Sequence, residues 1–475
     1  MALSAVGFAS YWVGLHGAYY ADDFKLVFPN PSSKIFYFFS HPNPNSSFYR
    51  PLEWMVVSIV QWLAGMNTFP IHLIILICHI ALSYLVFIAA FRLTESQPVA
   101  WLSSGYMLLS QANAMAVLGN DMLSQVCGTL FGFISIWYFY RVCIFIDEPH
   151  RQGRLYLFSL FCFTISLWFK ETSVGFALAL TLMPFMANAK RWSRNFLRSV
   201  YHLSPFYIVT AAYVMVHFSV VTRQAADRYE FHFGLNVLKN LCLSILSAFL
   251  PTSSVATFVA YSQHHFFSLS LIVIAALVVF SLFLVGLIRA GLTTPVKILI
   301  AVSLASLFPM LLFKHMGELY VYNSMPALAI LFGLGIENFY QRYLKRRSAK
   351  IGGALLVGLL FLSHGDADFE KGRMGVIDGQ RAAELINEIQ PFIDKVSYDG
   401  TLVLLNPTAH GPRYSIFLMD GFNVLIYGTN ILNQVSNRYD MHVWIMDEGS
   451  RESQSLPSDA LVLTLTKNHV QMLNR

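Results

Sequence analysis

The stretch Tyr19-Tyr20-Ala21-Asp22-Asp23-Phe24 ends the first apolar segment of the chain, which covers residues 2–20. Two adjacent carboxylates therefore stand where a membrane-spanning helix of about 20 apolar residues would leave the bilayer. Ionisable residues at such a position either mark the hydrated membrane surface or line a cleft at its edge. Because further ionisable pairs follow later apolar segments, we expect the chain to be organised around one cleft at this end of its helices.

The composition is typical of a polytopic membrane protein. Of the 475 residues, 56% are hydrophobic and 12% are charged, whereas soluble domains contain roughly 25% charged residues. The net charge of +6 comes from Lys and Arg in short loops between apolar segments, a pattern that indicates membrane orientation. We therefore expect a lipid bilayer and no nucleic acid among the partners. The five cysteines lie in apolar segments without metal-type spacing.

About eleven apolar segments are long enough to span a membrane. They lie near residues 2–20, 70–91, 99–118, 122–140, 155–169, 172–189, 200–221, 266–288, 296–313, 319–340 and 351–364. Two shorter apolar stretches, 51–66 and 235–250, are expected to form juxtamembrane helices along the outer interface instead. An odd number of spans places the two ends of the chain on opposite sides of the membrane.

The basic residues before position 365 assign the two sides. Fifteen of them fall in one set of loops and eight in the other, so the first set is expected to be cytoplasmic. Asp22, Asp23 and the C-terminal end then face outward. We predict a multi-pass protein of the bacterial inner membrane, or of the ER membrane in a eukaryote, with an extracytoplasmic site.

A second domain is expected after residue 364, because more than half of the 26 acidic residues lie beyond that point. The pattern predicts an amphipathic helix at 380–394 and strands at 401–405, 424–427, 442–446 and 460–465. The predicted organisation is a transmembrane domain at 1–364 and a small extracytoplasmic α/β domain at 365–475.

Asp22 and Asp23 are the candidate catalytic residues. Transfer of a group to a hydroxyl needs a base that takes the hydroxyl proton, and a carboxylate at the edge of a cleft suits that role. The second carboxylate could orient the acceptor or hold a divalent cation, for which Glu318 is a further candidate ligand. The alternative is a hydrated helix end that marks the membrane surface.

Candidate binding residues follow the later apolar segments. A guanidinium such as Arg50 can bind phosphate through two hydrogen bonds, and ionisable groups such as Lys170-Glu171, inside an apolar stretch, are costly unless functional. The candidates are Tyr49, Arg50, Asn120, Asp121, Lys170, Glu171, Lys314, His315, Glu318, Tyr320 and Tyr322. Each group also has a structural interpretation, as an interfacial anchor, a turn, a self-satisfied ion pair or a polar rim.

The order of these motifs resembles a known superfamily. Asp22-Asp23 is followed by Tyr49-Arg50-Pro51-Leu52, His72, His79, Asn120-Asp121, Lys170-Glu171-Thr172, and Glu318 with Tyr320 and Tyr322. Over residues 10–335 this is similar to the GT-C superfamily of polyprenyl-phosphate-dependent glycosyltransferases, which includes protein O-mannosyltransferases and aminoarabinose transferases. It most resembles the O-mannosyltransferase branch with transmembrane and tetratricopeptide repeat regions.

The resemblance implies an inverting transfer of a sugar from a dolichyl- or undecaprenyl-phosphate donor to a hydroxyl of a protein or glycolipid. One Asp of the Asp22-Asp23 pair would be the base, and Arg50, Lys170 and residues 314–322 would surround the donor. The chain departs from the family at Leu319, where a basic residue is expected, and at Gly119-Asn120, and it lacks the repeats. Two alternatives stay open: a non-enzymatic lipid-linked sugar transporter or flippase, and an O-antigen ligase or polymerase.

Overall fold

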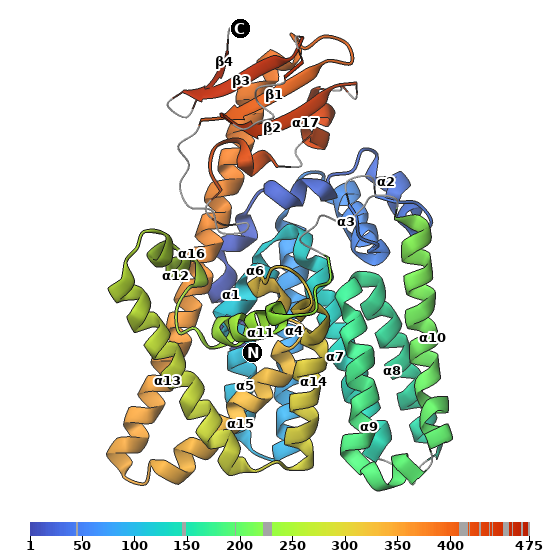
Figure 1. Ribbon diagram of the computed structural model, residues 1–475, viewed down its shortest axis with the longest axis vertical. Helices are drawn as coiled ribbons and strands as arrows, with labels where there is room; N and C mark the ends of the chain where they lie inside the picture. Colours follow the sequence, from blue (N-terminus) through green and yellow to red (C-terminus); the bar gives the residue numbers. More distant parts are fainter. Residues whose placement is uncertain are drawn as a thin grey trace.

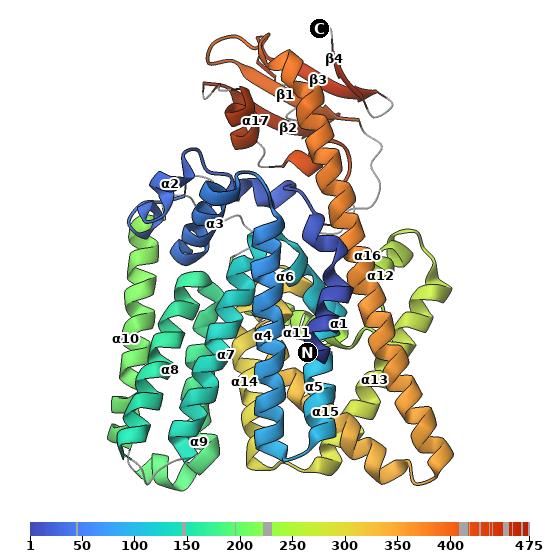
Figure 2. The ribbon, with the colours of Figure 1, turned by 180° about the vertical axis from the view of Figure 1, so that it is seen from behind.

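A computed structural model shows a long helical bundle with a small sheet at one end, joined by one helix that runs through both (Figures 1 and 2). The structure describes residues 1–43, 46–144, 149–194, 196–221, 230–407, 417, 419–426, 429–436, 438, 440–449, 456–457, 459–466 and 469–473.

The helices before the sheet are α1 (Ala2–Tyr11), α2 (Pro31–Lys34), α3 (Pro51–Ala64), α4 (Phe69–Thr94), α5 (Gln97–Leu109), α6 (Ala114–Leu118), α7 (Leu123–Ile144), α8 (Pro149–Phe169), α9 (Val174–Arg194), α10 (Phe196–Val220), α11 (Leu235–Phe249), α12 (Ser254–Ser262), α13 (Phe266–Ala290), α14 (Thr294–Leu311), α15 (Met325–Tyr343) and α16 (Arg347–Ile393). Short 3-10 helices connect several of them, namely η1 (Val13–His16), η2 (Ala21–Leu26), η3 (Tyr37–Phe39), η4 (Gln111–Asn113), η5 (Asn120–Met122), η6 (Glu171–Ser173) and η8 (Glu318–Val321).

Six of the described helices are long and apolar enough to cross a membrane, and a seventh crossing results if α11 and α12, bent by 118°, count as one broken span. These six are α4, α7, α10, α13, α14 and α16. The chain is therefore a multi-pass integral membrane protein. Helical structure lies at each predicted span, but the total of eleven crossings stays a prediction. The 14-residue α3 is about 21 Å long, too short for a hydrocarbon core of about 30 Å, as expected for 51–66.

The predicted spans 2–20 and 99–118 are not continuous helices. The segment 2–20 is α-helical only as far as Tyr11, because the chain then packs closely against α16: a Cβ on Gly372 would lie 3.1 Å from the backbone nitrogen of Gly14. The segment 99–118 divides into α5, η4 and α6. At that break the Asn113 side chain donates to the Met107 carbonyl over 2.7 Å and so satisfies a backbone group at the end of α5.

The predicted boundary at residue 364 falls inside α16, which continues unbroken for 47 residues. The predicted span 351–364 and the predicted helix 380–394 are thus parts of one helix. No proline occurs in α16 before Pro391, so nothing in the sequence stops the helix at the composition change. The acidic residues mark where α16 leaves its apolar surroundings, and in Figure 2 it extends beyond the bundle to the sheet.

The C-terminal domain contains a four-stranded sheet in the order β2-β1-β3-β4. Its elements are β1 (Thr401–Asn406), η9 (Gly421–Leu425), α17 (Thr429–Ser436), β2 (His442–Asp447), β3 (Leu461–Thr466) and β4 (His469–Met472). β1 is parallel to β2 and β3, whereas β4 is antiparallel to β3. The strands predicted at 401–405, 442–446 and 460–465 are confirmed, and β4 was not predicted.

The strand predicted at 424–427 is wrong. Residues 421–425 form the 3-10 helix η9, while Tyr427 lies outside the described residues. Gly421 begins the segment with φ of 56°, a conformation that suits a tight turn and not a strand. Phe422, Val424 and Leu425 are buried in it together, so their apolar character arises from packing in a turn.

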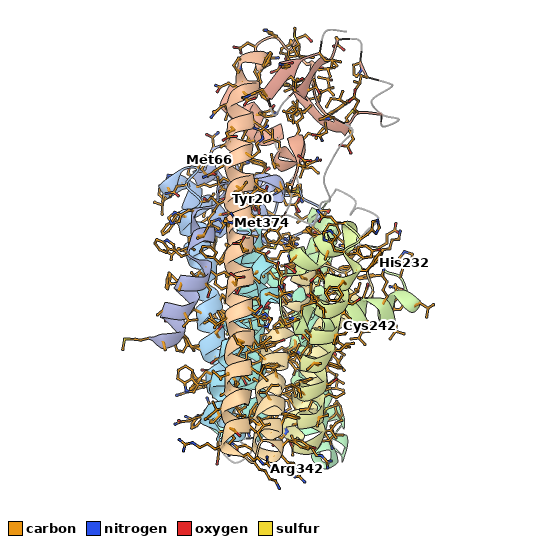
Figure 3. The ribbon with its side chains drawn as sticks, turned by 90° about the vertical axis from the view of Figure 1, so that its left-hand side faces the viewer. Tyr20, Met66, His232, Cys242, Arg342 and Met374 are labelled. Carbon is orange, nitrogen blue, oxygen red and sulfur yellow. The ribbon has the colours of Figure 1, made fainter. Side chains whose placement is uncertain are left out.

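The two ends of the bundle differ. The short connections from α4 to α5, α13 to α14 and α15 to α16 lie at the end away from the sheet (Figures 1 and 2). In Figure 3, Arg342 lies at that end, whereas Tyr20 and Met374 lie toward the sheet. The end that holds Arg342 is the one that the positive-inside rule predicts to be cytoplasmic.

Candidate active site

A pocket of about 410 Å³ opens where the 3-10 helices η2, η5, η6 and η8 meet the N-terminus of α3. Each of these segments interrupts or precedes an apolar helix, so polar side chains enter the pocket where the helices break. Its ionisable lining residues are Asp22, Lys25, Arg50, Glu53, Asp121, Lys170, Glu171, His315, Glu318 and Tyr320. Asp23, Tyr49, Asn120, Lys314 and Tyr322, all predicted from sequence, do not line it.

The segment η2 presents Asp22 to the pocket. The preceding Ala21 has φ of 49°, a left-handed conformation that is costly for a residue with a Cβ and is often found at functional sites. The Asp22 carboxylate forms an ion pair of 2.9 Å with Lys25, one helical turn later. Of the two adjacent carboxylates, Asp22 is thus the one with access to a ligand.

Asp23 holds two of the broken segments together. Its carboxylate is buried and accepts four hydrogen bonds, from the backbone of Tyr20 (3.4 Å), Asn120 (3.1 Å) and Asp121 (3.2 Å) and from the Asn120 side chain (2.9 Å). Burial raises the pKa of Asp23, and the Asn120 hydrogen bond opposes that shift. The side chain joins η2 to η5, and through this joint it fixes the position of Asp121.

Asp121 is the second pocket carboxylate near η2. It lines the pocket from η5, where its backbone N–H donates to the Asp23 carboxylate over 3.2 Å. A second carboxyl group in the pocket that holds Asp22 can accept a hydrogen bond from a ligand hydroxyl or share its proton.

The Arg50 guanidinium is bound to carboxylates of the protein itself. It donates two hydrogen bonds of 2.8 Å to the two oxygens of Glu171, and it lies 3.7 Å from Glu53. Burial acts to raise the pKa of Glu171, but Arg50 outweighs it and lowers that pKa to about 2. Tyr49, beside Arg50, is buried and donates from its hydroxyl to the Phe39 carbonyl over 2.9 Å, so it supports the loop rather than the pocket.

Lys170 is the contrasting cation. It is 4% exposed and lines the pocket, yet its ammonium group makes no hydrogen bond or ion pair with any residue that the structure describes. Burial, followed by repulsion from Arg50, lowers the pKa of Lys170 to about 8. The self-satisfied Lys170–Glu171 pair considered from sequence is therefore absent among the described residues. A buried cation that faces a cavity without a partner is suited to bind an anion.

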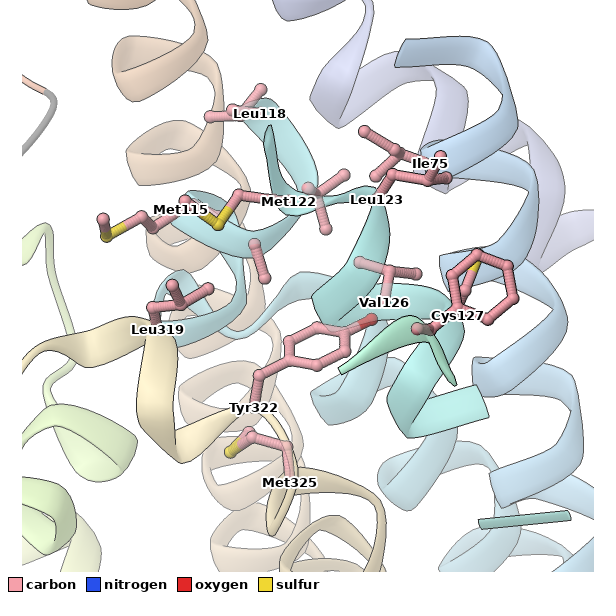
Figure 4. Packing of buried hydrophobic residues seen from close by; sticks show 14 of the residues in the cluster. Ile75, Met115, Leu118, Met122, Leu123, Val126, Cys127, Leu319, Tyr322 and Met325 are labelled. Carbon is pink, nitrogen blue, oxygen red and sulfur yellow. The ribbon is translucent and has the colours of Figure 1, made fainter. Parts of the chain in front are cut away.

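Only some of the candidate side chains in residues 314–322 face the pocket. His315 and Tyr320 line the pocket and are hydrogen-bonded to each other over 3.1 Å. Lys314 instead pairs with Glu230 over 2.6 Å, and Tyr322 is fully buried against His79 over 2.7 Å. Figure 4 shows Tyr322 among apolar side chains that include Leu319 and Val126.

Glu318 lines the pocket from η8. Its carboxylate accepts from the Lys371 ammonium of α16 over 2.8 Å and from the Ser254 hydroxyl of α12.

Sequence reasoning missed Lys25, Glu53 and Lys371. Lys25 lies three residues after Asp22, a spacing that places both side chains on one side of a helical turn and could have signalled the pair. Glu53 was visible as a charge in an apolar stretch. For Lys371 the sequence offers no signal, because its partner Glu318 is 53 residues away.

The predicted divalent-cation site at Asp22, Asp23 and Glu318 stays a prediction. Within the described part of the chain, no group of three or more His, Cys, Asp or Glu side chains is placed to hold a metal ion.

No protein-family model matches this sequence, and no curated protein does. Among solved structures, the chain is similar to ArnT from Cupriavidus metallidurans bound to undecaprenyl phosphate, with a TM-score of 0.55 and 13% identity, covering 98% of this chain and 92% of that one. The same ArnT in the apo state matches with a TM-score of 0.52 over the same share of each chain. At this identity the similarity concerns the fold alone, and the resemblance read from the sequence is confirmed at that level: the chain has the fold of ArnT.

Proposed function

We propose that the protein is a membrane glycosyltransferase that moves a sugar, with inversion, from a polyprenyl-phosphate donor to an acceptor hydroxyl at the outer face of the membrane. The observation that carries the proposal is the buried Lys170 ammonium, which has no hydrogen bond or ion pair among the described residues and lines the same pocket as the carboxylates of Asp22 and Asp121. An anion site next to a base is what transfer from a phosphate-linked donor requires.

Lys170 would bind the donor phosphate. An ammonium without a protein partner loses no ion pair when a phosphate arrives, whereas Arg50 would first have to leave Glu171. The donor class is further supported by ArnT, whose structure with the same fold is bound to undecaprenyl phosphate. Arg50 would then order the pocket by holding Glu171 and Glu53.

Asp22 would act as the general base. In the proposed step, its carboxylate takes the proton of the acceptor hydroxyl while the hydroxyl oxygen bonds to the anomeric carbon of the sugar. The bond from that carbon to the phosphate oxygen breaks on the opposite face, which inverts the configuration. Polyprenyl phosphate leaves with the bonding electron pair, and Lys170 offsets the charge on its oxygens. The carboxyl group of Asp121, in the same pocket, would share this proton with Asp22.

The acceptor would be a protein or glycolipid hydroxyl on the side of the membrane that the C-terminal domain occupies. η9 and α17 of that domain contact η2, which carries Asp22, so residues 365–475 would border the entry to the site. A lipid-linked sugar transporter would need ionisable groups spread through the bilayer midplane. The ionisable residues of this pocket instead gather around η2, which contacts the C-terminal domain at one end of the bundle.

The test is to incubate purified full-length protein with undecaprenyl- and dolichyl-phosphate sugars and with peptide and glycolipid acceptors. The expected result is acceptor-dependent release of polyprenyl phosphate and a product with inverted anomeric configuration. Lys170→Met should weaken binding of undecaprenyl phosphate about 10- to 100-fold, since a hydrogen bond to a charged group is lost. Movement of intact lipid-linked sugar across vesicles, without cleavage of any donor, would support the transporter instead.

A further inference from the structure

A buried ion pair connects the pocket to α16. The Lys371 ammonium lies 2.8 Å from Glu318 Oε1, and both side chains are at most 2% exposed. The other two protons of the ammonium are also used, in hydrogen bonds to the carbonyl of Gln111 (3.0 Å) and to its side-chain oxygen (2.9 Å). Lys371 is thus fully satisfied, and it has no access to the pocket itself.

The Glu318 carboxylate is held on both sides. Oε1 accepts from Lys371, and Oε2 accepts from the Ser254 hydroxyl. The backbone N–H of Ser254 in turn donates to Gln111 Oε1 over 3.0 Å. An ionised carboxylate has about four lone-pair positions, so a carboxylate held in this way can also accept hydrogen bonds from a ligand. The orientation of Glu318 toward the pocket is therefore set by α16, η4 and α12 together.

Glu318 differs from the other paired carboxylates of the pocket. Asp22, Glu53 and Glu171 pair with Lys25 or Arg50, cations that line the same pocket. Among the ion pairs of the described residues, Glu318 alone in the pocket pairs with a cation outside the lining. A buried ion pair is seldom needed for stability, since apolar residues of equal volume serve as well. Its presence beside a pocket indicates that the Glu318 carboxylate itself is used.

The C-terminal domain closes over the other side of Lys371. The ammonium lies 5.8 Å from the ring centroid of Phe417, a fully buried residue between β1 and η9. η9 also packs on α16. Lys371 thus lies between the pocket carboxylate and the C-terminal domain.

We propose that Lys371 is a positioning residue for sugar recognition: it holds the Glu318 carboxylate oriented so that this group accepts hydrogen bonds from hydroxyl groups of the transferred sugar. The inference rests on the function proposed above and assigns different parts of the donor to different residues. Lys170 binds the phosphate of the donor, whereas Glu318, held by Lys371, binds its sugar.

The test compares two ligands in purified full-length protein: undecaprenyl phosphate, which lacks the sugar, and undecaprenyl-phosphate mannose or another donor that the wild-type protein cleaves. The variant is the double substitution Lys371→Met/Glu318→Gln, which removes both charges and leaves neither buried ion unpaired. We expect its Kd for undecaprenyl phosphate to stay within about twofold of wild type. Its kcat/KM for the sugar donor should fall about 10- to 100-fold, as for the loss of hydrogen bonds to a charged group.

The matched control is Arg373→Met/Glu370→Gln, which removes an exposed ion pair from the same helix. It should leave both measurements unchanged. Wild-type kcat/KM in a folded Lys371→Met/Glu318→Gln variant would show that Lys371 only neutralises a buried charge, and the inference would be overturned. If that variant does not fold, Lys371→Arg decides, because it keeps the charge but shifts Glu318. Reduced kcat/KM with unchanged Tm supports the inference, and unchanged kcat/KM overturns it.

A wild-type protein that cleaves no donor would contradict the proposed function itself, and the inference would fall with it. An active wild-type protein with an equally active double variant would contradict the inference alone.

Discussion

The two ends of the helical bundle are built differently. At the end near the sheet, the chain leaves its helices through 3-10 segments such as η2, η5, η6 and η8, and their polar side chains are drawn inward around a pocket. At the other end, helices are joined by short connections, and a side chain such as Arg289 forms an exposed hydrogen bond to Tyr343. A broken helix leaves backbone groups that need polar partners, so the breaks themselves bring ionisable residues inside.

Asp23 and Asn120 illustrate this relation. The backbone N–H groups of Asn120 and Asp121 start a new segment, and the Asp23 carboxylate satisfies both. The same hydrogen bonds place Asp121 in the pocket wall beside Asp22. Asp23, which satisfies backbone groups at a helix break, is therefore next to Asp22 and in contact with Asp121, both of which line the pocket.

The largest effect is expected for Asp22→Asn, which removes the proposed base without disturbing Asp23. Turnover of the donor should fall by about 10²- to 10⁴-fold, the usual contribution of general base catalysis. The Tm should stay close to that of wild type. Asp394→Asn, at an exposed position at the end of α16, serves as the control and should retain full turnover. Wild-type turnover in Asp22→Asn would remove this residue from the chemistry.

A second experiment distinguishes the roles of two pocket cations, Arg50 and Lys170. Arg50→Met leaves Glu171 and Glu53 without their partner and should destabilise the protein by about 2–3 kcal/mol, a partly buried case of breaking an ion pair. Lys170→Met breaks no pair among the described residues, so its unfolding midpoint in denaturant should stay at or above the wild-type value. Equal losses of stability in both variants would show that Lys170 is a structural cation as well.

The smallest effect is expected at the opposite end of the bundle. Arg289→Gln removes an exposed hydrogen bond to Tyr343 and should change the free energy of unfolding by no more than about 0.5 kcal/mol. Donor turnover should be unchanged. A clear loss of turnover in this variant would mean that the two ends are coupled, and the contrast between them would need revision.

Part of the site could be predicted because ionisable residues in apolar sequence are rare and costly. That reasoning, applied to the amino-acid sequence, selects Asp22, Asp121, Lys170 and Glu318, and the fold brings all four to one pocket. It could not separate Asp22 from Asp23, since adjacent residues point in different directions and only the fold decides which one is buried. It also could not show that Arg50 is occupied by Glu171, 121 residues away.

The fold was predictable to a similar extent. Hydrophobic segments of the right length predicted a multi-pass helical protein, and short apolar runs predicted β1 and β3. The breaks after Tyr11 and at Ser110 could not be predicted. The first depends on close contact with α16, and at the second the Gln111 carbonyl accepts from Lys371, a partner far along the chain. The continuity of α16 past Gly365 was hidden by a change in composition.

The amino-acid sequence by itself determined that the chain enters a membrane many times and which segments carry ionisable groups, since burial of apolar length in lipid and the cost of charge act locally. Tertiary structure decided which of those groups meet. Lys371 and Glu318 form their pair, and Lys170 faces the pocket without one among the described residues, because distant helices fix the distances between charges. Hydropathy is a property of each segment, whereas a site is a property of how the segments pack.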